Sequence, residues 1–493
     1  FKVVFFTFKF DGRFSSAYSE YDFSPNYVEN TFTNEVLSFE KEAMNKDSIF
    51  WNQLRPVPLT KEEVKDYKIK DSLKVVRKSK KYLDSLDTKS NAFSWLDPIT
   101  GYTYENSYKN WNASYKGPLL QANFNTVQGW NTSLGFAYFK QINKEGKWWE
   151  TGVDINYAFS ENRFRPTFFF TKKWNNFSRP KMTISGGIAV SQFNGRDPVH
   201  PMNNTYSSLI DRLNYLKIYE KQFAKISYSE EIKNGLYFSS SLEYANRKPL
   251  FNTTNFSFAG GRLNRTYTSN NPLAPLDFVN APFSEHKIAI LNLGTRVVFG
   301  QKYLSYPDKK FNLNNDKYPS LRLNYRKTFG TSSSNVHSDL ITTNLRQKIN
   351  IGNYGKLTYG VRGGLFLKKK DIPFMDNLQV LGNLLSFTLD LKSFDLLPYY
   401  KYFTNDKYAE MHLEHNFRGA ILSKIPLLNL LNFHIVAGGK GLFMADKNPY
   451  TESAVGLSNI GYGKWRFLRI DYVHSNYGGI KNEGLVFKIS LFN

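Results

Sequence analysis

The sequence predicts an all-β membrane protein: a transmembrane antiparallel β-barrel of about sixteen strands, with a small mixed α/β region before it. Three observations lead to this fold class. The C-terminal segment alternates between apolar and polar residues, internal segments repeat the alternation, and aromatic residues make up 17% of the 493-residue chain. A barrel strand needs one face in lipid and one toward a polar lumen, and barrels carry aromatic girdles at both membrane interfaces.

The last segment, residues 483–493, shows this pattern most clearly. Phe487 and Ile489 fall on one face of an extended chain and Lys488 falls on the other. An amphipathic edge strand of a soluble sandwich alternates in the same way, so the upstream segments must decide between the two. The segment also resembles the terminal signal that outer-membrane barrels show to their assembly machinery. The residues that carry this resemblance are Gly484, Phe487, Ile489 and Phe492.

The composition excludes several classes of protein. No window approaches about eighteen consecutive apolar residues, which excludes a helical membrane span. The absence of cysteine excludes disulfides, thiolate metal sites and a cysteine nucleophile. The net charge of +23 is spread over the chain, so nucleic acid is not an expected partner, and lipopolysaccharide phosphates are the more natural counter-charge. We expect any signal peptide to have been removed ahead of Phe1.

Residues 1–110 are predicted to form a periplasmic pre-barrel region of short strands and helices. Apolar spacing favours a short helix within residues 34–51. Thr60 and Glu63 form a capping box, so a polar helix should follow over residues 61–84. This basic helix is either a solvated surface or a contact surface for a partner.

Residues 111–493 are predicted to form the barrel. Residues 149–159 and 356–367 alternate over about the nine to eleven residues that cross a hydrocarbon core. Such segments recur along the chain in an even number, as single-chain barrels require. The predicted strands are 117–125, 127–141, 147–159, 163–173, 181–193, 217–231, 234–246, 284–300, 318–329, 335–349, 354–367, 407–419, 430–440, 449–459, 463–475 and 483–492.

This strand count places the long connections on one side of the membrane. Residues 194–216, 247–283 and 368–406 all fall outside the cell if the last strand runs toward the periplasm. Outer-membrane barrels keep long loops outside and short turns inside, so the count is self-consistent. Residues 301–317 are long for an inner turn, which indicates either a functional contact or an error in the count.

Several segments resemble the Bacteroidetes outer-membrane barrel family that has a carboxypeptidase-regulatory-like domain and a C-terminal domain of unknown function. The resemblance spans most of residues 30–493. It implies a signal peptide and a small immunoglobulin-like domain ahead of this region, and despite the family's name no peptidase activity follows from it. The segments that carry it are Trp51–Thr60, Gly300–Pro319, Leu396–Phe417 and Thr451–Ile460.

A weaker resemblance is to the barrel-insertase superfamily. It rests on the strand number, the pre-barrel region, residues 123–136 at the start of the barrel and a long apolar loop five strands from the end. The Arg-Gly-aromatic motif of that superfamily's loop is replaced here by Val380-Leu381-Gly382-Asn383. The resemblance therefore does not carry an insertase mechanism.

Glu410, His412 and Glu414 share the predicted lumen face of one strand, at a spacing that suits a divalent cation. The alternative, which we favour, is a lumenal charge network paired with basic residues across the barrel, and no metal or cofactor is expected. Mixed lumenal charge of this kind is more typical of a locked plug than of an open pore. Basic residues predicted on lumen faces are Arg322, Arg326, Arg346, Lys348, Lys356, Arg362 and Arg469.

The sequence gives little support to an enzyme. Asp471 with His474 is an accidental candidate for a hydrolase pair, and the Gly-x-Ser-x-Gly elbow is absent. We therefore expect no enzymatic activity.

Two apolar connections are better functional candidates. Residues 368–406 are too apolar for a free loop and should fold into the lumen or bind a partner. Residues 420–431 have leucines at helical spacing and should lie on the inner leaflet, dock a periplasmic subunit, or pack against the barrel rim. The predicted plug or partner contacts are Phe374, Met375, Leu378, Leu381, Leu384, Ile425 and Leu428.

These features favour a non-enzymatic outer-membrane barrel that is a subunit of a larger envelope assembly, export or transport complex, with its N-terminal region in the periplasm. Expected partners are outer-membrane lipid, lipopolysaccharide and other outer-membrane or periplasmic proteins. A passive or gated channel for small solutes is the alternative, and an outer-membrane enzyme is the third reading. An apolar loop inside the lumen would favour the partner-binding barrel, and unpaired charge around open space would favour the pore.

Overall fold

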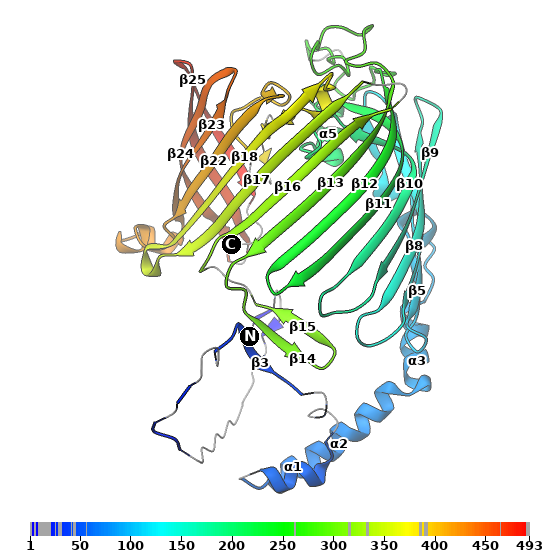
Figure 1. Cartoon of the computed structure of the whole chain (residues 1–493), viewed down its shortest axis with the longest axis vertical. Coiled ribbons are helices and arrows are strands. Elements are labelled where there is room, and N and C mark those ends of the chain that lie inside the picture. The colour runs from blue at the N-terminus through cyan, green and yellow to red at the C-terminus, as the bar shows by residue number, and fades with distance from the viewer. Residues whose placement is uncertain are drawn as a thin grey trace.

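The computed structural model is a closed antiparallel barrel (Figure 1). It describes residues 2–3, 6–7, 21–24, 26–27, 32–40, 42, 46–55, 57–260, 263–313, 317–331, 335–383, 387–388, 393–463 and 465–489. Within these residues, fifteen long strands form the wall, and the interrupted pair β5 and β6 adds a sixteenth against β7. The short strand β4 pairs with β5. The predicted fold class and the strand count of about sixteen are therefore confirmed.

From β7 onward the wall strands follow the predicted segments, with a shift of four residues at β23. The first predicted strand, 117–125, is wrong over most of its length: β5 ends at Lys116, residues 119–121 form the turn η2, and only Asn123–Asn125 is extended, as β6. β4, within residues 1–110, was not predicted as a barrel strand and pairs with β5. The wall strands are β4 (Tyr102–Asn106), β5 (Trp111–Lys116), β6 (Asn123–Asn125), β7 (Gly129–Gln141), β8 (Trp148–Ala158), β9 (Arg163–Lys173), β10 (Lys181–Gln192), β11 (Ile218–Lys233), β12 (Leu236–Pro249), β13 (His286–Val298), β16 (Ser320–Gly330), β17 (His337–Asn350), β18 (Lys356–Lys370), β22 (Lys407–Asn416), β23 (His434–Met444), β24 (Lys447–Tyr462), β25 (Trp465–Tyr477) and β26 (Ile480–Ile489).

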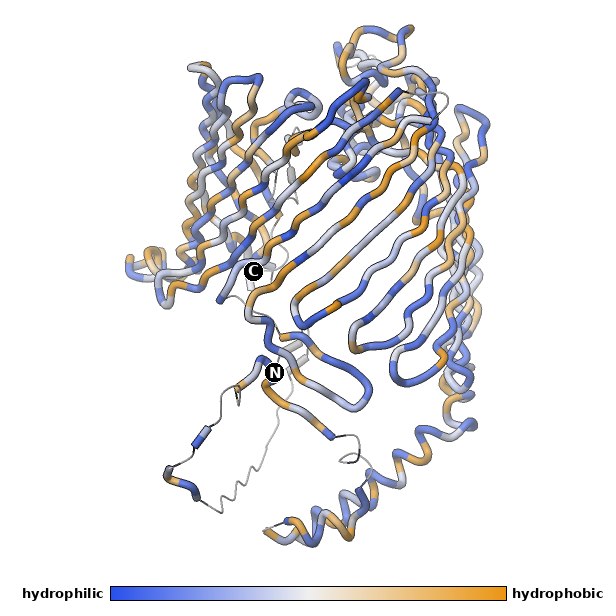
Figure 2. Tube along the Cα trace, viewed as in Figure 1, coloured by the Kyte–Doolittle hydropathy of each residue, from blue (hydrophilic) through white to orange (hydrophobic). Residues whose placement is uncertain are grey.

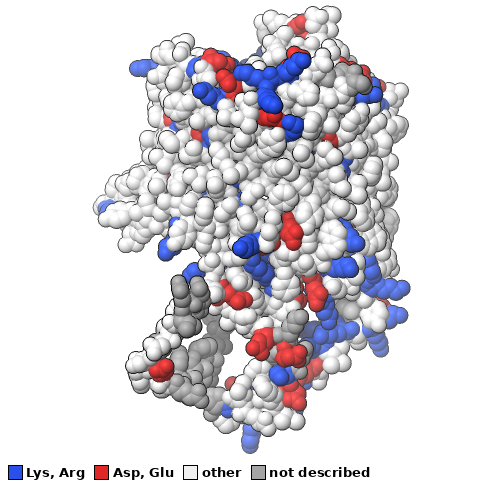
Figure 3. Space-filling view, viewed as in Figure 1, with Lys and Arg blue, Asp and Glu red and all other residues white. Residues whose placement is uncertain are grey.

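The wall has the two faces that a membrane barrel needs. On β26, Val486 and Lys488 are buried inside, whereas Leu485 and Phe487 are 63% and 42% exposed on the outside. Figure 2 shows hydrophobic and hydrophilic residues alternating along the wall strands. In the face shown in Figure 3, charged side chains gather toward the two ends of the molecule and are sparse on the wall between them. The apolar outer face is the surface that lipid covers.

The two ends of the barrel differ in their connections. Residues 193–217, 250–285 and 371–406 connect strands at one end, which also holds α5 (Pro201–Leu209). We call it the outer end because the sequence predicts that these connections lie outside the cell. At the opposite, inner end, β14 (Tyr303–Tyr306) and β15 (Lys309–Asn312) form a hairpin in the long connection between β13 and β16. This hairpin adds β3 (Glu35–Ser38) in parallel to β14. Residues 301–317 are therefore long because they contact the N-terminal region, and not because the predicted strand count is in error.

The N-terminal region carries the helices. The predicted capping box is present at α2 (Lys61–Lys78), where the Glu63 amide donates to Thr60 Oγ1 at 3.2 Å and the Thr60 amide donates to Glu63 Oε2 at 2.7 Å. The predicted helix over 61–84 is interrupted because Ser79 is extended and begins a second helix by accepting from the Tyr82 amide. Among the described residues, no helix is long and apolar enough to cross a membrane.

The helix predicted within residues 34–51 is wrong in its first half. Residues 35–38 form β3, because pairing with β14 supplies backbone hydrogen bonds that override a weak helical pattern. The second half begins α1 at Ser48, capped by Asp47. The remaining short elements are β1 (Lys2–Val3), β2 (Phe6–Thr7), α1 (Ser48–Leu54), α3 (Lys80–Ser90), α4 (Asp97–Thr100), η2 (Leu119–Gln121), η4 (Gly352–Tyr354), η5 (Phe374–Asp376), β19 (Leu378–Gln379), β20 (Phe387–Thr388), β21 (Phe403–Thr404), η6 (Leu422–Lys424) and α6 (Leu428–Leu431).

A buried lysine, Lys217, lies in the outer end where residues 193–217 meet residues 250–285. Its ammonium group donates to Thr268 Oγ1 and to the Ser269 carbonyl oxygen, each at 2.6 Å. Both partners are neutral, and burial lowers the pKa of Lys217 to about 7. The unfolded chain therefore binds more protons than the folded chain between about pH 7 and pH 10.4.

We expect stability to rise with pH over this range, because the cost of burying a charged amine disappears as Lys217 loses its proton. The slope is about 1.4 kcal/mol per pH unit at most. The urea midpoint of the detergent-solubilised protein, measured at pH 7 and pH 9, should increase for the wild type and change much less for Lys217→Met. Lys233→Met, an exposed lysine on β11, is the matched control. Equal pH slopes in all three proteins would contradict this expectation.

Candidate functional site

The described residues of the connection 371–406, hereafter the plug, fill the outer half of the lumen. Its described apolar side chains pack against buried side chains on the lumen faces of β17, β18, β22, β23 and β24. Lumen faces of barrels are ordinarily polar, so an apolar patch there is a surface built for the plug. The plug residues of this core are Leu378, Val380, Phe394, Leu397 and Tyr402, and the wall residues are Leu340, Phe366, Tyr408, Leu442, Met444 and Tyr450.

The plug residues that the sequence singles out lie in this interior. Phe374 and Met375 pack with Phe193 and Tyr219 at the outer end. Leu378 and Leu381 are also buried. Leu384 lies outside the described residues.

The plug also makes regular backbone contacts. β19 and β21 pair with each other and close the plug into a hairpin-like loop. β20 pairs in parallel with β26, so that Phe387 is opposite Phe487 and Thr388 is opposite Lys488. An added Cβ at Gly484 would lie 3.1 Å from Leu396 Cδ2, so the missing side chain makes room for the plug. The last strand, β26, is therefore both part of the wall and the strand on which the plug is seated, that is, to which its strand β20 pairs.

Asp376 anchors the first half of the plug. Its buried carboxylate accepts from Arg247 Nη1 at 2.5 Å and Nη2 at 3.2 Å, and it also pairs with Arg326. Burial alone would raise the pKa of Asp376, but the two guanidinium groups outweigh it and hold the pKa well below its usual range. Arg247 is itself buried, on β12, and β16 supplies Arg326. The anchor therefore joins the plug to two separate parts of the wall.

Asp395 anchors the second half of the plug. It pairs with Lys440 at 2.5 Å and with Lys488 at 2.8 Å, and the Glu452 carboxylate accepts from the backbone amides of Asp395 and Leu396 at 2.8 Å each. Burial favours a raised pKa for Asp395, but the two ammonium groups reverse this and lower it. Lys488 also reaches Asp471 at 2.9 Å. We call the connected set the β26 cluster, which consists of Asp395, Glu414, Lys440, Glu452, Arg469, Asp471 and Lys488.

The predicted metal candidates share the lumen face of β22 but do not converge on one point. Glu410 pairs with Arg362 at 2.6 Å and Arg196 at 3.6 Å, and Glu414 pairs with Arg469 at 2.9 Å. The ring of His412 lies 4.9 Å from the Phe394 ring of the plug, and neither ring nitrogen has a hydrogen-bond partner within the described part of the chain. The described residues hold no group of three metal-ligating side chains. Glu410 and Glu414 thus belong to a lumenal charge network in which each is paired with arginines, which is the alternative favoured from the sequence.

The hydrolase candidate is not assembled either. Asp471 is buried on the lumen face of β25, where it pairs with Arg469. His474 lies on the opposite face of the strand, where its Nδ1 atom is 3.2 Å from the carboxylate of the exposed Glu483. An odd spacing along a strand puts the two side chains on opposite faces of the wall.

The apolar inner connection, residues 420–431, projects sideways from the inner rim of the barrel (Figure 1). Leu427 and Leu430 are 79% and 73% exposed, and Ile425 and Leu428 are also exposed. These side chains therefore do not pack against the barrel rim. Of the predicted assembly-signal residues, Gly484, Phe487 and Ile489 lie on β26, and Phe492 lies outside the described residues.

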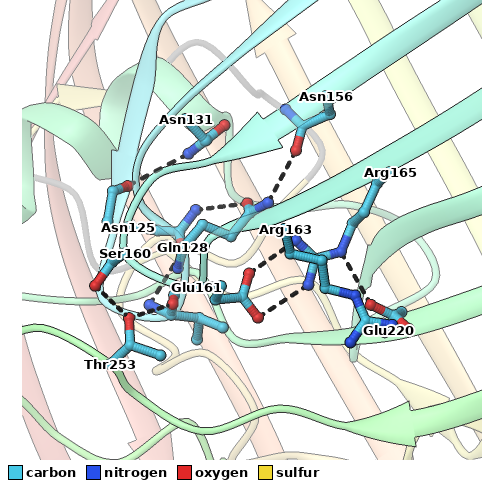
Figure 4. A network of polar contacts seen from close by, with 12 residues as sticks. Asn125, Gln128, Asn131, Asn156, Ser160, Glu161, Arg163, Arg165, Glu220 and Thr253 are labelled. Atoms are coloured by element: carbon cyan, nitrogen blue, oxygen red, sulfur yellow. Dashed lines mark hydrogen bonds and ion pairs between the residues drawn. The ribbon is translucent and has the colours of Figure 1, made fainter.

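Sequence reasoning missed a second polar network, on the lumen side of β7, β8 and β9 toward the outer end (Figure 4). The buried Arg165 donates to Glu220 Oε2 at 3.1 Å and to Glu161 Oε1 at 2.9 Å, and Arg163 pairs with Glu220 at 2.6 Å. Gln128 donates to Asn156 Oδ1 and accepts from Asn125. Arg165 and Glu220 are 55 residues apart in the sequence, so their pairing had no local signal.

These features define a transmembrane β-barrel whose lumen is filled by one of its own connections. The chain belongs to a family of unknown function, DUF5686, because the model of that family's C-terminal domain matches residues 96–457. No curated protein matches the sequence.

Solved structures with a similar trace are bacterial barrels. BamA from Haemophilus ducreyi lacking POTRA domains 1–3 is 13% identical, with 79% of this chain and 69% of that chain covered and a TM-score of 0.37. CdiB from Acinetobacter baumannii is 10% identical, with 74% and 57% covered and a TM-score of 0.33. A mutant of the Rh. blastica porin is 10% identical, with 73% and 89% covered and a TM-score of 0.28.

Proposed function

We propose that this chain is a non-enzymatic outer-membrane barrel that works as a subunit of a larger envelope assembly, export or transport complex. The plug is the observation that carries the proposal. An apolar loop fills the lumen and is held there by buried ion pairs. The surfaces available for function are therefore the outer surfaces of the barrel rather than an open path through it. The apolar outer wall supports a place in the membrane, and the long outer connections support an N-terminal region in the periplasm.

The N-terminal helix α2 is the surface we assign to a partner protein. None of its described residues is buried, and the helix extends away from the barrel (Figure 1). Leu73, Val75 and Val76 are exposed between basic residues. An exposed apolar surface with a basic surround is typical of a protein contact.

A gentle-detergent pull-down of the tagged protein from native membranes, followed by mass spectrometry, tests the proposal. We expect stoichiometric recovery of another envelope protein with the wild type. Val75→Glu should lower that recovery about tenfold, because a charge at an apolar contact costs about 1.4 kcal/mol or more. Leu276→Glu, at an apolar position of the outer end that is even more exposed than Val75, should leave the recovery unchanged. Recovery of the barrel alone would contradict the proposal.

A gated channel for small solutes is the second candidate. Two cavities that remain between the plug and the inner end favour it. Conductance in planar bilayers distinguishes the two functions: a channel would open in the wild type, whereas the partner-binding barrel stays closed until an anchor of the plug is removed.

A further inference from the structure

The lumen below the plug contains two adjoining cavities of about 640 Å³ and about 670 Å³. Both are lined by Arg296, Arg322 and Asn324, so the two spaces meet at these residues. Cavities of this size are typical of sites for small organic ligands. The described residues of the plug and the wall thus leave a chamber between them that they do not fill.

Positive charge dominates the point where the cavities meet. Arg296 and Arg322 are directly opposite each other in the register of β13 and β16. Like charges in opposite positions of neighbouring strands repel each other and destabilise a sheet. Within the described residues, neither guanidinium group has a carboxylate at ion-pair distance; Arg296 stacks instead on the Tyr237 ring at 4.1 Å.

The nearby acidic groups already have other partners. Glu231 is held by Lys310 at 2.7 Å and by Arg179 at 3.5 Å, and Glu230 accepts from the Tyr228 hydroxyl at 2.6 Å. Asp376, which lines the second cavity, is the anchor of the plug. The charges of Glu231 and Asp376 are therefore already balanced by other cations, and within the described residues Glu230 makes no ion pair with Arg296 or Arg322.

We propose that a phosphate-bearing anion binds between Arg296 and Arg322. A guanidinium group presents a planar fork of donors that matches phosphate oxygens, and two forks that face one space bind a doubly charged anion better than a singly charged one. Asn324 adds an amide at the same point. The bound anion removes the repulsion between the two arginines, so binding also stabilises the wall. This site is independent of the partner surface on α2.

Isothermal titration of the purified full-length chain in zwitterionic detergent, with inorganic pyrophosphate as the probe, tests the site. We expect saturable binding at one site that weakens at high salt. Arg296→Gln and Arg322→Gln should each weaken it about tenfold, since one charge-assisted bond contributes about 1.5–3 kcal/mol. Lys356→Gln removes the same charge from the lumen face of β18, outside both cavities, and should leave the affinity within about twofold.

The urea midpoints of the arginine variants should equal or exceed that of the wild type, because each substitution removes the repulsion between the two like charges. This control separates a loss of binding from a loss of folding.

A parallel titration with dihexanoyl phosphatidic acid distinguishes the source of the phosphate. Tighter binding of this lipid assigns the site to a headgroup, and tighter binding of pyrophosphate assigns it to a soluble anion. No saturable binding of either probe, or equal losses in Lys356→Gln and the arginine variants, would overturn the proposal.

Discussion

Replacing Asp376 by asparagine is expected to release the first half of the plug and open a path through the barrel. The substitution keeps the shape of the side chain but leaves Arg247 buried without its carboxylate. Removing one partner of a buried ion pair costs about 3–5 kcal/mol. If that cost falls on the plugged state, the unplugged population rises by about two to three and a half orders of magnitude at about 1.4 kcal/mol per tenfold change. Conductance in planar bilayers and limited trypsin cleavage between residues 371 and 406 should both increase.

Two further variants make this result specific. Asp406→Asn removes a carboxylate from the same segment, but its pair with Lys369 is long, at 3.6 Å, and exposed, so we expect almost no change. The double variant Arg247→Met, Asp376→Leu removes both charges and should close the barrel again in part, because apolar residues often replace a buried pair at little cost. Conductance in the double variant equal to that of Asp376→Asn would refute the ion pair as the cause.

The depressed pKa of Asp376 also sets the pH dependence of this anchor. A carboxyl whose pKa is lowered on folding stabilises the folded state above its unfolded pKa of about 3.9, and this stabilisation is lost as the pH falls through the folded value. The anchor should therefore hold from pH 8 down to pH 5. Wild-type conductance should stay low across this range.

The wall of the barrel was predictable because its signal is local. A strand with lipid on one side and a lumen on the other must alternate residue by residue, and β9 begins and ends where the alternation predicts. The side of the wall that Arg326 and Arg362 face follows from the same rule. The break at Ser79 was not predictable in this way, because a serine is tolerated inside a helix as well as at its start.

The anchors of the plug were not predictable because their signals are not local. Asp376 and Arg247 are 129 residues apart, and nothing in the spacing of either residue indicates the other. The apolar composition of residues 371–406 predicted burial or a partner but not the seat on β26. Charge pairing inside a lumen depends on which strands face each other across it, and that follows only from the closed barrel.

Replacing Lys488 by methionine is expected to destabilise the last strand more than removal of any single carboxylate near it. The β26 cluster holds four carboxylates and three cations, and Lys488 is the buried cation that lies between Asp395 at 2.8 Å and Asp471 at 2.9 Å. Without Lys488, these two buried carboxylates repel each other, at a cost of about 3–5 kcal/mol. The yield of folded barrel and its urea midpoint should both fall. Lys481→Met, an exposed lysine on the same strand, is the matched control.

The charge balance of the β26 cluster gives the decisive comparison. Asp395→Asn alone leaves three carboxylates and three cations, so its effect on the urea midpoint should be the smaller one. Combined with Lys488→Met, Asp395→Asn removes one of the repelling carboxylates and should restore part of the lost stability. Such a rescue is a coupling between neighbours that two independent losses cannot produce. If the two losses simply add, Lys488 acts through packing alone, and the seat of the plug on β26 does not depend on this ion pair.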